Sequence, residues 1–276
     1  MKYEKYEEGQ QLADLSKTDY TEIGTKAFLS CKTVEKIVLP EKTERIGDWA
    51  FSHAKRLKEI TVPLKNIELG KQVFLGLDCL EKISFLEESE SYVYEGIPYF
   101  MASLCRCFEN KQMWELEGLE TRQLEWLMNY DEMLADYLKR PADADFKPVF
   151  IGWFDVEDID SQLERHIVNT ETEKLELIFQ RLRFDKNLKE QIRKDMYEYI
   201  CGKEMQLRSL FCDKKKPYCE EILYYKLWEK AGGLTEHVAA GLLEEATVTD
   251  AEIRAYLLKV QLDKAKNIGF FDDLLL

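Results

Sequence analysis

Residues 23–85 read IGTKAFLSCKTVEKIVLPEKTER, IGDWAFSHAKRLKEITVPLKNIE and LGKQVFLGLDCLEKISF when the sequence is divided every 23 residues. Each segment opens on an aliphatic residue and a glycine, and an Ala-Phe or Val-Phe pair begins three residues after that glycine. A fixed period of this length indicates a solenoid, in which each unit buries its apolar residues by stacking on its neighbours. We therefore expect the phenylalanines at one phase, Phe28, Phe51 and Phe74, to form a row in the core.

The two halves of each unit predict different backbone shapes. Each unit ends with apolar residues at every second position, as at Ile37 and Leu39, and this period predicts a short strand with one buried face. Stacking would place these strands in one narrow parallel sheet. The Ile-Gly-x-x-Ala-Phe half, here called the returning side, has apolar spacing close to one helical turn. Its glycine is expected to permit the bend that returns the chain.

Charged residues at equal phase are expected to lie side by side on neighbouring strands. In two such rows the sign alternates from unit to unit: Glu35, Lys58 and Glu81 form one row, and Lys36, Glu59 and Lys82 form the other. Opposite charges on neighbouring strands stabilise a sheet by roughly 0.2–1 kcal/mol per pair. This face is therefore predicted to neutralise itself and to leave little field for a charged ligand.

The units resemble the BspA-like subgroup of leucine-rich repeats, whose units read Ile-Gly-x-x-Ala-Phe-x-x-Cys-x-x-Leu-x-x-Ile-x-Ile-Pro. The resemblance covers three units, over residues 23–85. It implies a leucine-rich repeat solenoid and a bacterial protein. Members of this group often carry many more units and are often exported to the surface of host-associated bacteria. This sequence has three units and no export signal, so the resemblance implies the fold rather than a role in adhesion.

The returning side carries a candidate partner-binding surface, formed by Trp49, His53, Leu29 and Leu75. Trp49 and His53 are four positions apart and would share one side of a helical turn. Tryptophan side chains are enriched among the residues that dominate protein interfaces. In the alternative, Trp49 packs beneath the N-terminal cap or the C-terminal region, because the end units of a solenoid need covering.

The remaining two thirds of the sequence predict helices. A polar stretch at residues 86–91 breaks the period, and amphipathic spacing follows from Pro98 onward. We expect seven or eight helices with short connections. The first four run from Pro98 past Leu104 and Phe108, from Leu124 to Leu138, over 158–168, and from a capping box at Thr170 and Glu173. The others run from Leu188 to Gly202, from Pro217 to Lys230, over 235–245, and over 250–265 from a capping box at Thr249 and Glu252.

The predicted fold class is α+β, with two domains. Residues 1–97 would form an N-terminal cap and the short leucine-rich repeat solenoid of three 23-residue units. Residues 98–276 would form an all-α antiparallel helical array. The last two helices weakly resemble an ankyrin-type pair, which suggests stacking of helix pairs and implies nothing further.

Net charge, the N-terminal sequence and the cysteine content limit which partners and which cellular location we expect. The net charge of −14 argues against nucleic acid, because polyanions require a basic surface to release counterions. The N-terminus lacks an apolar signal region and no stretch is long enough to span a bilayer, so we expect a cytoplasmic protein that does not bind membranes. Seven cysteines fit no disulfide framework in a chain of this length, and reduced cysteines are expected.

Motifs for catalysis and for phosphate or metal binding are absent from the sequence. The pairs Cys105 with Cys107, and Cys212 with Cys219, lack the spacing of a structural zinc site. We therefore name no catalytic residue and expect no metal or cofactor. The sequence predicts a non-enzymatic protein-protein interaction module or scaffold of a bacterial cell. The alternative is an enzyme or small-molecule sensor with a pocket in the helical domain or at the domain junction.

Overall fold

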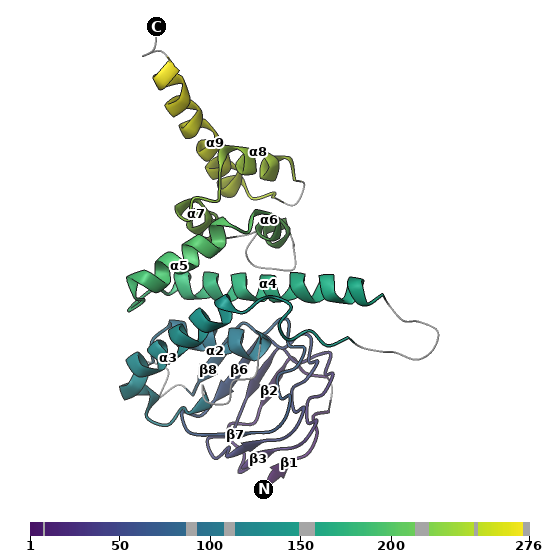
Figure 1. Cartoon of the computed structure of the whole chain (residues 1–276). Helices are drawn as coiled ribbons and strands as arrows, with labels where there is room; N and C mark the ends of the chain where they lie inside the picture. Colours follow the sequence, from purple (N-terminus) through teal and green to yellow (C-terminus); the bar gives the residue numbers. More distant parts are fainter. Residues whose placement is uncertain are drawn as a thin grey trace. The chain divides into compact units, whose positions relative to one another are not determined.

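The structure, a computed structural model, divides into two compact units, Met1–Met133 and Leu134–Leu276 (Figure 1). It describes residues 1–272 except for 8, 87–92, 108–113, 149–157, 213–220 and 246–247, and it describes side chains up to residue 262. The predicted domain boundary between residues 97 and 98 lies inside the first unit, and it stays a prediction.

Eight short strands of the first unit form two parallel sheets. The first sheet contains, in spatial order, β1 (Lys2–Tyr3), β3 (Glu22–Ile23), β5 (Arg45–Ile46) and β7 (Glu68–Leu69). The second contains β2 (Leu12–Asp14), β4 (Lys36–Val38), β6 (Glu59–Val62) and β8 (Lys82–Phe85). Each coil gives one strand to each sheet, so four coils stack into a solenoid (Figure 1).

The predicted solenoid and its narrow parallel sheet are confirmed, and the structure adds a second sheet that was not predicted. Ile46, which opens a sequence unit, lies in the first sheet and pairs with Ile23 and Leu69 at the same phase. These strands have two residues each, too few to show a period of two in the sequence. The second sheet holds the strands that the sequence predicted.

Residues before Ile23 add a coil that the sequence did not predict. Lys2 pairs with Glu22, 20 positions later, and Leu12 pairs with Lys36, 24 positions later. Both offsets differ from 23, so this coil shares the geometry of the repeats without sharing their period. The predicted N-terminal cap is therefore itself a coil of the solenoid.

A column of aromatic rings runs through the core of the first unit. Phe28, Phe51 and Phe74 are at most 2 % exposed, and their neighbouring ring centroids lie 5.6 and 6.0 Å apart. Tyr6 stacks on Phe28 at one end, with the centroids 5.1 Å apart, and Trp114 stacks on Phe74 at the other, also at 5.1 Å. The predicted phenylalanine row is confirmed, and residues outside the repeats extend it.

Glycine begins each returning segment because neighbouring coils approach closely there. A Cβ atom built on Gly47 would lie 2.6 Å from the backbone nitrogen of Thr25, and one on Gly70 would lie 2.6 Å from that of Asp48. The expectation that these glycines permit a special bend was wrong, since none of them has a positive φ. The missing side chain is what allows the coils to stack.

Alternating charges cross the outer faces of both sheets. In the second sheet, Lys36 Nζ lies 3.0 Å from Glu59 Oε1, as the phase predicted. Burial acts to raise the pKa of Glu59, but hydrogen bonds from Ser84 and Lys36 and the charge of Lys82 lower it below its usual value. The predicted self-neutralisation is thus confirmed for this row.

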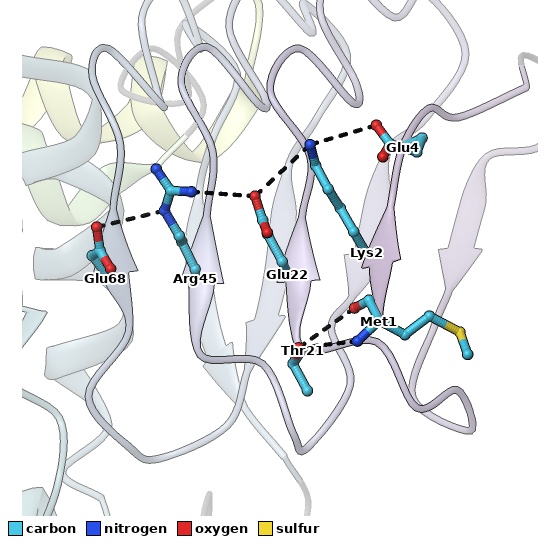
Figure 2. Close-up of polar contacts among 7 residues, drawn as sticks. All are labelled: Met1, Lys2, Glu4, Thr21, Glu22, Arg45 and Glu68. Atoms are coloured by element: carbon cyan, nitrogen blue, oxygen red, sulfur yellow. Dashed lines mark hydrogen bonds and ion pairs between the residues drawn. The ribbon is translucent and has the colours of Figure 1, made fainter.

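Figure 2 shows a comparable row on the first sheet, which the sequence did not predict. Glu22 lies between Lys2, at 3.9 Å, and Arg45, at 3.4 Å, and Arg45 also contacts Glu68 at 3.5 Å. These pairs are largely exposed, so each contributes well under about 1 kcal/mol. Their main consequence is that this face carries little unbalanced charge.

Two helices follow the repeats, α2 (Gly96–Cys107) and α3 (Leu119–Lys139), and α3 crosses into the second unit. α2 packs against β8, and Phe100 of α2 stacks on Tyr130 of α3 with the centroids 4.9 Å apart. Both helices were predicted. Leu124 was wrongly placed on the apolar face, because it is 56 % exposed and lies to one side of the stripe centred on Leu127 and Leu134.

The described helices of the second unit are α4 (Ile159–Arg183), α5 (Glu190–Cys201), α6 (Glu204–Cys212), α7 (Ile222–Lys230), α8 (Glu236–Glu244) and α9 (Ala251–Asp272). Together with α2 and α3 they make eight helices in the described residues, which confirms a solenoid followed by a helical part. α5 ends before Gly202, as predicted, and Thr235 caps α8, whose cap was not predicted. α6 was missed. Phe108, Pro217 and Cys219, which entered the predictions, lie outside the described residues.

Both predicted capping boxes were wrong. Thr170 lies within α4, which continues from Ile159 to Arg183 without a glycine or proline to stop it. For α9, Asp250 takes the place predicted for Thr249: its Oδ1 accepts a hydrogen bond from the Ile253 backbone N–H at 2.9 Å. Asp250, one residue closer to the helix than Thr249, thus supplies the side-chain acceptor that caps the N-terminus of α9.

A buried ionic cluster joins α3, α4 and α5 in the second unit. Lys174 is 1 % exposed, donates a hydrogen bond to the Arg140 carbonyl at 2.5 Å, and lies 5.4 and 6.0 Å from the ring centroids of Tyr137 and Tyr199. Glu171 accepts a hydrogen bond from the Tyr199 hydroxyl at 2.6 Å. Burial lowers the pKa of Lys174, and the charge of Glu171 offsets only part of that effect.

Candidate partner-binding surface

The returning turns, defined as residues 24–35, 47–58 and 70–81, are hydrogen-bonded from coil to coil. Alternate backbone N–H groups donate to carbonyls of the next coil: Lys26 to Asp48 at 2.9 Å, Phe28 to Ala50 at 2.7 Å, Ser30 to Ser52 at 2.9 Å, Trp49 to Lys71 at 2.9 Å, Phe51 to Val73 at 3.1 Å, and His53 to Leu75 at 2.7 Å. These bonds fix the backbone of the returning turns. Side chains that point outward from it are therefore held at set positions.

The returning turns contain left-handed residues where a helical turn was predicted. Two phases have positive φ in every repeat: Lys26 (61°), Trp49 (54°) and Gln72 (49°) at one, and Ser30 (56°), His53 (56°) and Gly76 (69°) at the other. The predicted helical turn between Trp49 and His53 was therefore wrong. Each left-handed non-glycine residue costs about 1 kcal/mol, which the inter-coil hydrogen bonds and the buried ring column must offset.

Trp49 is half-buried and is held by residues at its own phase. Its Nε1 donates a hydrogen bond to Gln72 Oε1 at 2.7 Å, and Lys26 Nζ lies 5.5 Å from the centroid of its ring system. Gln72 comes from the next coil and Lys26 from the preceding one. The indole N–H is thus engaged within the solenoid, while part of the ring stays accessible.

The other three predicted residues are exposed but unevenly spaced. Leu29 is 38 % and Leu75 45 % exposed, and the fully buried Ser52 occupies their phase in the coil between them. His53 is exposed and lies against Gly76, since a Cβ atom built there would come within 2.4 Å of His53 Nδ1. His53 and Leu75 are therefore neighbours, whereas Leu29 lies two coils from Leu75. A partner-binding role for the four residues stays a prediction.

The residues that hold Trp49 were not predicted to do so, although the period contains the signal. Lys26 and Gln72 stand 23 positions before and after Trp49. Residues one period apart in a solenoid are adjacent in space, so counting 23 positions in each direction from Trp49 identifies both neighbours. One feature of the sequence indicates the left-handed φ of His53: Gly76 stands at the same phase in the next unit, and glycine readily adopts a positive φ.

Across the described part of the chain, no three or more His, Cys, Asp or Glu side chains are grouped so that they could hold a metal ion. None of the described helices is long and apolar enough to cross a membrane. Of the cysteines considered for zinc, Cys105 is buried and Cys107 and Cys212 are half-buried.

Comparison with known proteins identifies the repeats. Residues 11–101, about a third of the chain, match the family model described as BspA type leucine rich repeat region (6 copies). No curated protein and no solved structure matches the chain. The ankyrin-type resemblance of α8 and α9 finds no match in these comparisons and stays a prediction. The matched range covers the strands from β2 to β8 and part of α2. Residues 11–101 are thus a leucine-rich repeat region of the BspA type.

Proposed function

We propose that this chain is a non-enzymatic protein-interaction module of a bacterial cell and that its partner binds the returning turns. One observation carries the proposal. Leu29, His53 and Leu75 are held outward on a backbone that is hydrogen-bonded from coil to coil. Leucine-rich repeats generally mediate protein-protein interaction, and the match to the BspA-type family supports the same role here.

Burial of the exposed leucines supplies a reason for a partner to bind. Leu29 and Leu75 take no part in the core, because Phe28 and Phe74 beside them fill it. Covering apolar surface yields about 25 cal/mol per Å². The fixed backbone also reduces the conformational entropy that binding would cost.

The outer faces of the sheets offer less to a protein partner. Their charged rows satisfy one another, as Lys36 does with Glu59 and Arg45 with Glu22. A partner would have to break these pairs or leave them at its rim, where exposed pairs contribute little. The returning turns are therefore the better candidate.

Replacing both leucines tests the proposal. The partner is first captured from native cells with the full chain, identified by mass spectrometry, and purified. The double variant Leu29→Ser/Leu75→Ser should weaken its binding at least about tenfold in surface plasmon resonance, since anchor residues contribute more than 1 kcal/mol each. Its melting temperature should stay at the wild-type value, because neither side chain is buried.

Leu258→Ser is the matched control. Leu258 is 47 % exposed, close to the 45 % of Leu75, but belongs to α9 in the second unit. The control should bind like the wild type. Weakening by the control alone would place the partner on the second unit, and equal binding by all three proteins would remove the returning turns from consideration.

A further inference from the structure

We infer that the returning turns of the first two repeats, residues 24–35 and 47–58, bind an acidic protein segment that carries large apolar side chains. The inference rests on the proposed function and adds the chemistry of the partner. It comes from how charge is distributed within the first unit. A chain of net charge −14 has a locally basic surface at these turns.

Three of the five Lys and Arg residues of these turns are exposed and lack a carboxylate partner among the described residues. Lys26, Lys32 and Lys55 are all exposed, and no described carboxylate lies within 4.0 Å of their ammonium groups. Lys26 Nζ lies 5.5 Å from the centroid of the Trp49 ring system, a contact that leaves its charge in place. On the sheets, by contrast, Lys2, Lys36 and Arg45 each pair with a glutamate.

The same turns contain two acidic residues, Glu35 and Asp48. Asp48 Oδ1 accepts a hydrogen bond from the Lys71 backbone N–H at 2.8 Å. Glu35, at the edge of the second sheet, pairs with Arg56 and with Lys58, the latter at 4.0 Å. Asp48 keeps its charge when it accepts a backbone hydrogen bond, and Glu35 offsets one of the two cations beside it. Five Lys and Arg residues against two carboxylates nevertheless give the turns of the first two repeats a net charge of +3.

Exposed apolar surface accompanies this charge. Leu29 lies one position before Ser30 and three before Lys32, and the partly accessible ring of Trp49 lies one coil further along. Protein interfaces commonly combine an apolar centre with a polar rim, and opposite charge on the partner speeds and orients association. An acidic segment with leucine or phenylalanine side chains satisfies both parts of this surface.

A peptide titration of the full chain tests the inference. The probe is a 12-residue peptide in which glutamates surround two leucines and one phenylalanine. The matched peptides carry lysine or serine in place of glutamate, and a 12-nucleotide single-stranded DNA provides a polyanion of another class. Amide chemical shifts of the isotope-labelled chain report where each probe binds.

The acidic peptide should shift amides of residues 29–32 and 53–55, and its binding should weaken as salt is raised. The variant Lys32→Glu/Lys55→Glu should weaken this binding about tenfold or more, because two favourable charges become unfavourable. The variant Lys17→Glu/Lys259→Glu changes the net charge equally at two exposed lysines elsewhere and should bind like the wild type.

Several results would overturn the inference. These are equal binding of the lysine peptide, shifts confined to the sheets or the second unit, absence of any shift, and binding of the DNA alone. Binding of the serine peptide at the same amides, unaffected by Lys32→Glu/Lys55→Glu, would overturn the acidic partner yet preserve the proposed function. Failure of that function is detected separately, by the leucine double variant with the native partner.

Discussion

Trp114 stacks on Phe74 with ring centroids 5.1 Å apart and planes inclined by 15°. A residue from beyond the repeats thereby continues the phenylalanine column and closes its end. Trp114 is 6 % exposed, so its ring counts as part of the core. Trp114 covers the ring of Phe74 and α2 packs against β8, so both protect the last coil, which has no further repeat to bury it.

Trp114→Ala should therefore destabilise the first unit by about 3 kcal/mol, the cost of a large cavity beside a buried ring. Urea unfolding followed by far-ultraviolet circular dichroism measures the loss, and amide hydrogen exchange should show it concentrated in the coil of Phe74. Trp49→Ala is the control. Trp49 is half-buried, so its removal should cost clearly less. Equal costs would mean that Trp114 does not close the column.

Gly47→Ala should destabilise the solenoid by about 1–3 kcal/mol, because its Cβ has no room between the coils. The atom would lie 2.6 Å from the Thr25 nitrogen, and backbone cannot move aside as a side chain can. Gly202→Ala is the control, since the nearest atom to its Cβ would be 3.8 Å away. The control should change the unfolding free energy by less than about 0.5 kcal/mol. A harmless Gly47→Ala would contradict the close approach of the coils.

His53 and Gly76 should show energetic coupling. In Gly76→Ala the new Cβ meets His53 Nδ1 at 2.4 Å and also takes on a left-handed φ of 69°. Combining it with His53→Ala removes the steric part and leaves the backbone strain of about 1 kcal/mol. A double-mutant cycle should give a coupling of at least about 0.5 kcal/mol, with the pair less destabilised than the sum of the singles. Strict additivity would show that the ring does not lie against Gly76.

The sequence predicted the features that repeat and missed those that occur once or have no residue signature. Phe28, Phe51 and Phe74 were predictable because a constant period places them in one environment. The first coil was not, since Lys2 and Leu12 pair at offsets of 20 and 24. The left-handed φ of Trp49 has no signature in a tryptophan, so apolar spacing alone suggested a helical turn.

Short sequence patterns led to wrong predictions where a helix continued past them. Thr170 with Glu173 has the spacing of a helix start, yet α4 passes through both because nothing interrupts it. At the candidate surface, Leu29 and Leu75 are exposed although Ser52 at the same phase is buried, so phase alone did not determine exposure. The hydrogen bond from Trp49 to Gln72, by contrast, joins residues one period apart. Whether a partner uses these residues depends on a second molecule, which one sequence does not describe.

Lys174→Met should remove a pH dependence from the second unit. The pKa of Lys174 is lowered from 10.5, mainly by burial, so the folded chain releases this proton before the unfolded chain does. The penalty for burying the charge is complete below the folded-state pKa and is relieved as pH rises toward 10.5. The unfolding free energy of the wild type should thus rise relative to Lys174→Met between neutral pH and pH 10.5. Parallel or converse curves would contradict the lowered pKa.

Because the charges alternate from coil to coil, their pairing is preserved only when the number of units changes by an even number. Deleting residues 45–67 would remove one 23-residue unit and keep every hydrophobic phase. It would nevertheless bring Glu22 beside Glu68 in the first sheet and Lys36 beside Lys82 in the second. Like charges directly opposite one another destabilise strand pairing, so these rows would become repulsive.

Two units removed or inserted together would restore the alternation, whereas one would not. A coil that docked one unit out of place would match its apolar residues but bring like charges together, at a cost well under about 1 kcal/mol for each exposed pair. In this solenoid, the hydrophobic core requires the 23-residue period, and the alternating surface charges favour an even change in the number of units.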